Sequence, residues 1–200
     1  MIKRLLFILL ASSALAANAS TITFQPTSQI INLGASTSVD VSIGGLSARE
    51  ALGAFDLFVT NNSSIITPTS VLFYNNLGDA SLQLTDSLLS GGLANAAETS
   101  FESTATLLAL QSSQPFALFR LTYMGVGVGT SALTLGDGSI LADGNGTILS
   151  DPTVTPGSIT VVEDGGMSPV PEPSTLVLLS SGVSVLMASV KRRRTANVPA

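Results

Sequence analysis

Short apolar stretches with the two-residue period of β-strands occupy the middle of this chain and restrict its fold more than any other feature. Val39, Val41 and Ile43 alternate with polar residues, so they should lie on one face of a strand. Residues 54–59 are apolar almost throughout, as expected for a strand near the middle of a packed sheet. Glycine, asparagine, aspartate and proline separate these stretches, and short strands joined by such turns predict an all-β sandwich.

The same signals predict further strands along the chain. They are expected at 69–74, 81–85, 116–123, 131–135, 140–142, 147–149 and 158–162. The pattern within 116–123 places Ala117, Phe119, Leu121 and Tyr123 on one side and Arg120 on the other. Small residues and glycine leave 90–102 without a firm assignment.

One short helix is expected at 103–111. Ser103 is a suitable N-cap residue, because its side-chain oxygen can accept a hydrogen bond from a backbone N–H of the first turn. The leucine spacing predicts that Leu107, Leu108 and Leu110 pack inward. No internal repeat is visible, so a solenoid or a propeller is not expected.

Composition excludes several classes of chemistry. The 200 residues include no cysteine and no histidine, which rules out disulfides, thiolate or imidazole metal sites and Ser-His-Asp or Cys-His catalysis. Only Arg49 and Arg120 are basic between Ser20 and Pro169, against twelve acidic residues, a net charge of −10. Such a surface repels nucleic acid, so we expect no nucleic-acid partner.

The first 19 residues have the features of a secretory signal peptide. Lys3 and Arg4 supply the positive start, and an apolar centre runs from Leu5 to Leu15. The small residues Ala17 and Ala19 then predict cleavage before Ser20, and cleavage after Ala16 is the alternative. The chain is therefore expected to be exported by the secretion machinery.

A second targeting segment lies at residues 170–194. Val170, Pro171, Glu172 and Pro173 precede an apolar stretch, and Lys191, Arg192, Arg193 and Arg194 follow it. The 16 residues 175–190 reach about 24 Å as a helix, somewhat less than the ~30 Å hydrocarbon layer. Because basic residues beside an apolar helix are retained in the cytoplasm, we expect a transmembrane helix with its tail inside.

This element order resembles the PEP-CTERM sorting signal. The resemblance implies that an exosortase-type enzyme in the membrane processes the chain at Val170–Pro173, after which the protein reaches the cell envelope or an extracellular polysaccharide matrix. An ordinary single-pass anchor with an accidental Pro-Glu-Pro is the alternative. The expected organisation is a signal peptide (1–19), a sandwich (20–163), a linker (164–169), the sorting signal (170–194) and a tail (195–200).

The middle of the chain resembles a cohesin-like module. The resemblance is carried by 39–43, 52–57, 116–123, 141–146 and 156–161. It implies a jelly-roll sandwich of about nine strands, related in fold to carbohydrate-binding modules. Cohesins bind calcium-bearing dockerins in multi-enzyme scaffolds, but this chain holds one module with no dockerin and no catalytic domain, so the fold carries over better than that partner.

Oxygen-bearing side chains in glycine-rich turns suggest one metal hypothesis. Asp137, Asp143 and Asn145 are the best candidates for a calcium site, because calcium takes several oxygen ligands from a tight loop. Asp-Gly and Asn-Gly are also strong hairpin signals, and a plain hairpin turn is the favoured interpretation. No other cofactor is expected.

Ligand binding and catalysis have few other candidates. Tyr74 and Tyr123 combine a ring with a polar tip and could contact a glycan, and one of Phe73 and Tyr74 should be exposed. Glu98 and Glu102 could form an acid pair, although a solvated face is the simpler interpretation. Asp56 could be a ligand or a partner of Arg49 or Arg120, and a hydrogen-bonded structural role is the favoured interpretation.

These observations predict a non-enzymatic surface protein that adheres to a polysaccharide or to another surface protein. A carbohydrate-binding module proper is the first alternative. A hydrolase that uses only carboxylates is the second.

Overall fold

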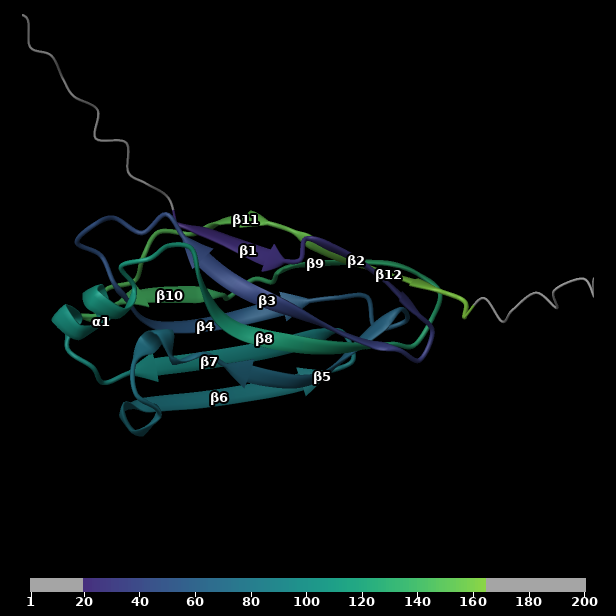
Figure 1. Cartoon of the computed structure of the whole chain (residues 1–200), viewed down its shortest axis with the longest axis horizontal. Coiled ribbons are helices and arrows are strands. Elements are labelled where there is room, and N and C mark those ends of the chain that lie inside the picture. Colours follow the sequence, from purple (N-terminus) through teal and green to yellow (C-terminus); the bar gives the residue numbers. More distant parts are fainter. Residues whose placement is uncertain (1–19, 165–200) are drawn as a thin grey trace, which may run out of the picture. The chain divides into compact units, whose positions relative to one another are not determined.

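The computed structural model describes residues 20–164, which form two β-sheets packed face to face (Figure 1). One sheet has the order β11-β1-β3-β8-β5, with β1 at Thr21–Gln25, β3 at Ser36–Gly44, β5 at Ile66–Phe73, β8 at Phe116–Gly125 and β11 at Thr153–Thr155. The other has the order β2-β12-β9-β4-β7-β6, and β10 also pairs with β4. Its strands are β2 (Ser28–Asn32), β4 (Leu52–Thr60), β6 (Gln83–Ser90), β7 (Leu93–Ser100), β9 (Gly129–Leu135), β10 (Ile140–Asp143) and β12 (Gly157–Val162).

The all-β sandwich is confirmed, but the strand count is not. Twelve strands lie between Ser20 and Asp164, where about nine were expected. The additional strands are β1, β2 and β11, which were not expected, and β7, which lies in the stretch 90–102 that had no firm assignment. The strand expected at 147–149 is reduced to a single bridge between Ile148 and Ala142.

The first and last parts of this domain each change sheet at a proline. β1 pairs with β11 and β2 pairs with β12, both in parallel. Pro26 separates β1 from β2, and Pro156 separates β11 from β12. Proline has no N–H to donate to a ladder, which interrupts each strand and allows the chain to cross to the opposite sheet. The sequence patterns predicted neither β1, β2 nor β11.

The predicted alternation builds the core. Val39, Val41 and Ile43 of β3 are buried, as expected, and they face Leu57 and Val59 of β4 in a common apolar cluster. The rings of Phe55 and Phe119 stack with centroids 5.6 Å apart, which joins the two sheets near their middle.

A β-bulge in β8 means that Ala117 does not point to the side of the sheet that the sequence predicted. Val41 pairs with Phe119 and Ser42 pairs with Ala117, so Leu118 is an extra residue in the ladder. Phe119, Leu121 and Tyr123 point inward as predicted, and Arg120 is exposed. The prediction for Ala117 was wrong, because the bulge reverses the alternation and buries Leu118 instead.

The predicted position of the helix and its N-cap residue are confirmed. The prediction that three leucines pack inward holds fully for only one of them. α1 spans Thr104–Leu110, and the Ser103 hydroxyl accepts a hydrogen bond from the N–H of Thr106 at 3.2 Å. Leu107 is fully buried, whereas Leu108 is half-buried and Leu110 is exposed. The buried side of the helix continues four residues later at Gln111, whose side chain hydrogen-bonds to both backbone groups of Leu52, so Leu110 points away. Two short 3₁₀ helices, η1 (Asn75–Leu77) and η2 (Ala80–Leu82), lie before β6.

Within residues 20–164, the helices are all too short or too polar to traverse a lipid bilayer. The predicted signal peptide and transmembrane helix fall on residues 1–19 and 165–200, outside the described part of the chain.

Candidate functional site

β6 directs two of its three leucines away from the core, whereas Leu89 packs against it. Leu84 and Leu88 pair with Thr99 and Asn95 of β7 and are 65% and 64% exposed. The inward positions of β6 carry polar residues such as Thr85, which pairs with the buried Glu98. A strand of a soluble sandwich normally has the opposite polarity, with its apolar residues facing the core.

Neighbouring strands extend this exposed surface, as the arrangement of β6, β7, β4 and β10 in Figure 1 indicates. Ile140 pairs with Asp56, and Ile148 bridges to Ala142, which places both isoleucines on the outer side of the sheet. The half-buried Phe58 lies on the same side of β4. Leu82 and Phe101, both exposed, continue the β6–β7 pairing through a backbone hydrogen bond of 2.8 Å. We call this surface the apolar sheet face; it comprises Phe58, Leu82, Leu84, Leu88, Phe101, Ile140 and Ile148.

The polar groups among the side chains of the apolar sheet face include two acids, Asp56 and Asp86, and the neutral Asn95 and Thr99. Asp56 accepts a hydrogen bond from the Asn95 side chain, so its predicted structural role is confirmed. Asp86 is exposed between Leu84 and Leu88. The positions between the large side chains are occupied by small residues, Ala54, Ala97 and Ala142, which do not protrude from the sheet. A contiguous apolar surface with an acidic component is typical of a protein interaction site rather than of a catalytic cleft.

The outer side of the other sheet has a different chemistry. Asp40 of β3 accepts two hydrogen bonds from Arg120 of β8, at 2.8 and 3.0 Å, and a third from the Tyr74 hydroxyl at 2.9 Å. The Arg120 guanidinium lies 5.9 Å from the Tyr74 ring centroid, a cation–π contact. These bonds, above all those from Arg120, lower the pKa of Asp40. Hydroxyl residues share this outer side: Thr21, Ser36, Ser38, Ser70, Thr122, Thr153 and Thr155.

The two tyrosines predicted as glycan contacts have different outcomes. Tyr123 is completely buried in the core, which also raises its pKa, so it cannot contact a ligand at the surface and the prediction was wrong. Tyr74 is half-buried, its hydroxyl is used by Asp40, and Arg120 lies over its ring. Neither Phe73 nor Tyr74 is fully exposed, because Phe73 packs against the core and the exposed residue is Leu72.

The predicted calcium ligands do not converge. Asp143 accepts hydrogen bonds from the N–H groups of Asn145 and Thr147, at 2.9 and 2.8 Å, which form a hairpin turn and lower its pKa. The Asn145 side-chain oxygen accepts from Thr104. Asp137 precedes β10, whereas Asp143 is its last residue. The strand between them, from Ile140 to Asp143, is extended over about 10 Å. Among residues 20–164, no group of three acidic side chains could hold a metal ion.

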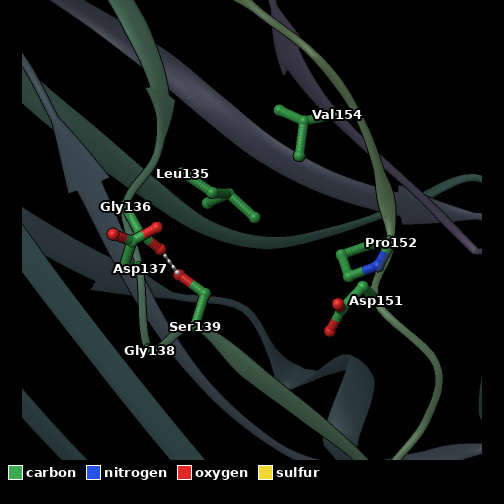
Figure 2. A pocket seen from close by; sticks show the side chains of 8 residues that line it. All are labelled: Leu135, Gly136, Asp137, Gly138, Ser139, Asp151, Pro152 and Val154. Atoms are coloured by element: carbon green, nitrogen blue, oxygen red, sulfur yellow. Dashed lines mark hydrogen bonds between the residues drawn. The ribbon is translucent and has the colours of Figure 1, made fainter.

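Asp137 instead lines a shallow pocket of about 220 Å³ beside β9 (Figure 2). Asp151 and Pro152 form its other wall, and the Ser139 hydroxyl donates to the Gly136 carbonyl oxygen at 3.0 Å. The two carboxylates lie on opposite sides of the pocket in Figure 2. The Ser139 hydroxyl also accepts a hydrogen bond from the Phe58 N–H at 3.1 Å, so its printed bonds are both to the backbone.

Glu98 does not lie on a solvated face with Glu102, as the sequence suggested, because its side chain is buried. Glu98 of β7 is 1% exposed, and its carboxylate oxygens have no hydrogen-bond partner among the described residues. Burial raises its pKa to about 7. Glu102 is half-buried next to Gly78. Glu98 is therefore a core residue rather than part of a solvated face.

The C-terminal segment matches a known sorting motif. The family model described as PEP-CTERM protein-sorting motif matches residues 169–194. This chain carries a PEP-CTERM sorting motif. The match covers both Val170–Pro173 and the basic cluster Lys191–Arg194, and it confirms that part of the resemblance. The cleavage positions and the membrane helix remain predictions.

Solved structures confirm the second resemblance. A cohesin from Clostridium acetobutylicum shares 21% sequence identity, covers 73% of this chain and 92% of its own, and has a TM-score of 0.56. A non-cellulosomal cohesin from the archaeon Archaeoglobus fulgidus shares 17%, covers 74% and 94%, and has a TM-score of 0.55. A cohesin module from a family 33 glycoside hydrolase of Clostridium perfringens shares 12%, covers 74% and 99%, and has a TM-score of 0.57. The domain that precedes the PEP-CTERM motif thus has a cohesin-like fold, and no curated protein matches the sequence significantly.

The apolar sheet face was not predicted from the sequence. Leu84 and Leu88 alternate with Thr85 and Ser87, which would normally place the leucines inside. The signal that could have revealed the face is on β7, where Ala94 and Ala96 alternate with polar Asn95.

Proposed function

We propose that this protein is an exported, exosortase-sorted surface protein whose sandwich binds another protein through the apolar sheet face. The observation that carries the proposal is the reversed polarity of β6, in which Leu84 and Leu88 face solvent. Pairing shifted by one residue would have turned both side chains toward the core. Exposing large apolar side chains costs free energy of hydration, and their burial against a partner recovers it. The PEP-CTERM motif supports delivery to the cell surface, where such a partner would be met.

The face also indicates what kind of partner fits. Asp86 lies between the two leucines, and the exported segment carries ten more acidic than basic residues. A complementary partner would present apolar side chains next to lysine or arginine, because opposite charges steer association and like charges oppose it. A cohesin–dockerin complex from Clostridium thermocellum is among the similar structures, with 14% identity and a TM-score of 0.55, and it supports a protein-binding role for this fold class. The identity of the present partner is not implied by that likeness.

The route to the surface is part of the same proposal. The signal peptide would be removed before Ser20, and the chain would then be held by residues 175–190 with the basic cluster 191–194 in the cytoplasm. Processing at Pro171–Pro173 would release the sandwich to the cell envelope or to an extracellular matrix.

Site-specific photo-crosslinking in the producing cells tests the binding surface. A photoreactive amino acid is placed at Leu84, and the matched control carries it at Leu72 of β5, which is exposed to 57% but lies on the other sheet. We expect one protein to crosslink from position 84 and not from position 72. Adding Leu88→Asp should abolish the crosslink from position 84, because a carboxylate would be buried in the interface without a partner.

Two results would count against the proposed surface. Equal crosslinking from positions 72 and 84 would show that the contact is not confined to the apolar sheet face. An unchanged crosslink from position 84 in the presence of Leu88→Asp would show that the leucines do not bind the partner. Thermal unfolding of Leu88→Asp, an exposed substitution, checks that the fold is retained.

A second candidate function is carbohydrate binding on the opposite sheet. The arrangement of Asp40, Arg120 and Tyr74 among hydroxyl side chains favours it, since charged and hydroxyl groups can hydrogen-bond to sugar hydroxyls. A matrix polysaccharide would be the ligand class. Glycan-array binding that is lost on Arg120→Ala and retained in Leu84→Asp would support this function, and an array without signal would remove it.

A further inference from the structure

Three loops at one end of the sandwich expose apolar side chains next to the point where the described chain ends. Leu33 follows β2, Val126 and Val128 lie between β8 and β9, and Val162 ends β12. All four side chains are exposed. Figure 1 shows these connections together at the end of the sandwich opposite α1. We call this group the apolar tip; it comprises Leu33, Val126, Val128 and Val162.

Backbone hydrogen bonds hold the apolar tip together. The N–H of Leu33 donates to the Val162 carbonyl oxygen at 2.8 Å, and the N–H of Gly34 donates to the Gly125 carbonyl oxygen at 2.9 Å. The N–H groups of Val126 and Gly127 both donate to the Ile65 carbonyl oxygen. The exposed side chains are therefore carried by ordered backbone.

The glycines around Val128 explain how this loop is fixed. A Cβ on Gly127 would overlap the Ser64 carbonyl oxygen, and Gly129 has a φ of +142°, which other residues rarely adopt. Without these glycines the loop could not lie so close to residues 64–65. The loop is thus built to present Val126 and Val128 outward.

Charge is absent from the loops of the apolar tip. Residues 33–36, 61–66 and 125–129 contain no acidic and no basic side chain, although the exported segment as a whole is strongly acidic. The first charges are Glu163 and Asp164, after the last strand. These loops, at one end of an acidic body, could enter a lipid headgroup region without burying a charged side chain of their own.

The length of the following chain brings this end near the membrane. Ten residues, 165–174, separate Asp164 from the apolar stretch 175–190, and ten residues span at most about 35 Å. The ten-residue strand β8 is itself about 33 Å long, so the opposite end of the sandwich lies about one strand length farther from the tether. The apolar tip is consequently the region held at high effective concentration at the bilayer surface.

We propose that the apolar tip inserts into the headgroup region of the membrane while the chain is held by its C-terminal segment. This proposal rests on the anchoring step of the proposed function. The contact would orient the sandwich with its long direction away from the bilayer and leave the apolar sheet face accessible. It would also hold residues 165–174 close to the membrane surface, where the Pro-Glu-Pro element is to be processed.

Fluorescence quenching by lipids tests this contact directly. The chain has no cysteine, so Val128→Cys and Leu84→Cys each give a single labelling site, exposed to 55% and 65% in the native side chains. The full chain, with an environment-sensitive dye at either site, is reconstituted into phosphatidylcholine vesicles that contain a nitroxide-labelled lipid. We expect a blue shift and a loss of emission for the dye at position 128, and no change at position 84. Leu33→Asp in the Val128→Cys background should remove both effects.

The outcomes separate the tip from the anchor. Protein that floats with the vesicles but shows equal emission at both positions would overturn the tip contact and leave anchoring intact. Protein that does not float with the vesicles would overturn the anchoring step, and the tip contact with it. A spectral shift at position 128 that appears only when membranes containing the processing enzyme are added would assign the tip to a protein partner and overturn the lipid contact.

Discussion

The buried carboxyl of Glu98 should make this fold more stable in mild acid than at neutral pH. Glu98 pairs with Phe55 across β4 and β7 and with Thr85 of β6, and its carboxylate has no hydrogen-bond partner among the described residues. Burial without a partner raises its pKa from 4.5 to about 7. In the unfolded chain Glu98 ionises near pH 4.5, whereas in the folded protein it keeps its proton to about pH 7.

The sign and size of the effect follow from linkage. Between pH 4.5 and 7 the folded state binds more protons than the unfolded state, so the free energy of unfolding falls as the pH rises through this window. A shift from 4.5 to about 7 corresponds to at most about 3 kcal/mol. Asp40 acts in the opposite direction at lower pH, because its lowered pKa adds stability that is lost only as the pH falls below its normal value of 3.8.

Urea unfolding at pH 4.5, 5.5, 6.5 and 7.5 measures this dependence in the wild type, Glu98→Gln and Asp86→Asn. We expect Glu98→Gln to flatten the profile over this window and to be more stable than the wild type at pH 7.5, by up to about 3 kcal/mol. Asp86 is an exposed carboxylate on the adjacent strand, so Asp86→Asn should keep the wild-type profile. A wild-type profile that is flat or rises between pH 4.5 and 7, or one that Glu98→Gln leaves unchanged, would refute the reasoning.

Three further predictions concern stability and metal binding. Tyr74→Phe removes one hydrogen bond to Asp40 while leaving the Arg120 pair, so chemical denaturation should show a loss of about 1 kcal/mol; no loss would mean that this bond adds nothing in water. Leu107→Ala should destabilise the fold by about 2–5 kcal/mol because Leu107 is fully buried, whereas Leu110→Ala should change it by less than about 0.5 kcal/mol; similar losses in calorimetry would contradict the observed orientation of α1. Millimolar calcium should leave the melting temperature unchanged, since Asp137 lies apart from Asp143 and Asn145; an increase that Asp143→Asn removes would restore the calcium hypothesis.

How far the sequence predicts this structure depends on where each strand lies in it. The alternation of Val39, Val41 and Ile43 fixed the orientation of a central strand, because a one-residue slip would expose every apolar side chain. The N-cap Ser103 likewise predicted the start of α1. Both features depend on local chemistry, which a sequence pattern records directly.

The errors occur where long-range packing overrides the local pattern. The bulge at Leu118 reverses the facing of Ala117, and it depends on the fit of β8 between β3 and β5. Leu84 and Leu88 face solvent in the register that places Thr85 opposite the buried Glu98, and the alternation within β6 does not reveal that register. Tyr123 could be assigned to the surface from its polar tip alone, but its place among inward-facing residues of β8 buries it. The apolar sheet face could be recognised only from the sheet order.

The most direct test of the account is the mass and location of the protein in its own cells, compared with a Pro171→Ala/Glu172→Ala variant. The account predicts that the native protein starts at Ser20 or at residue 17, lacks the basic cluster 191–194 and lies in the envelope or outside the cell. The variant should keep the basic cluster and stay in the membrane fraction. An intact chain of 200 residues in the cytoplasm, or an identical mass and distribution for the two proteins, would contradict the account.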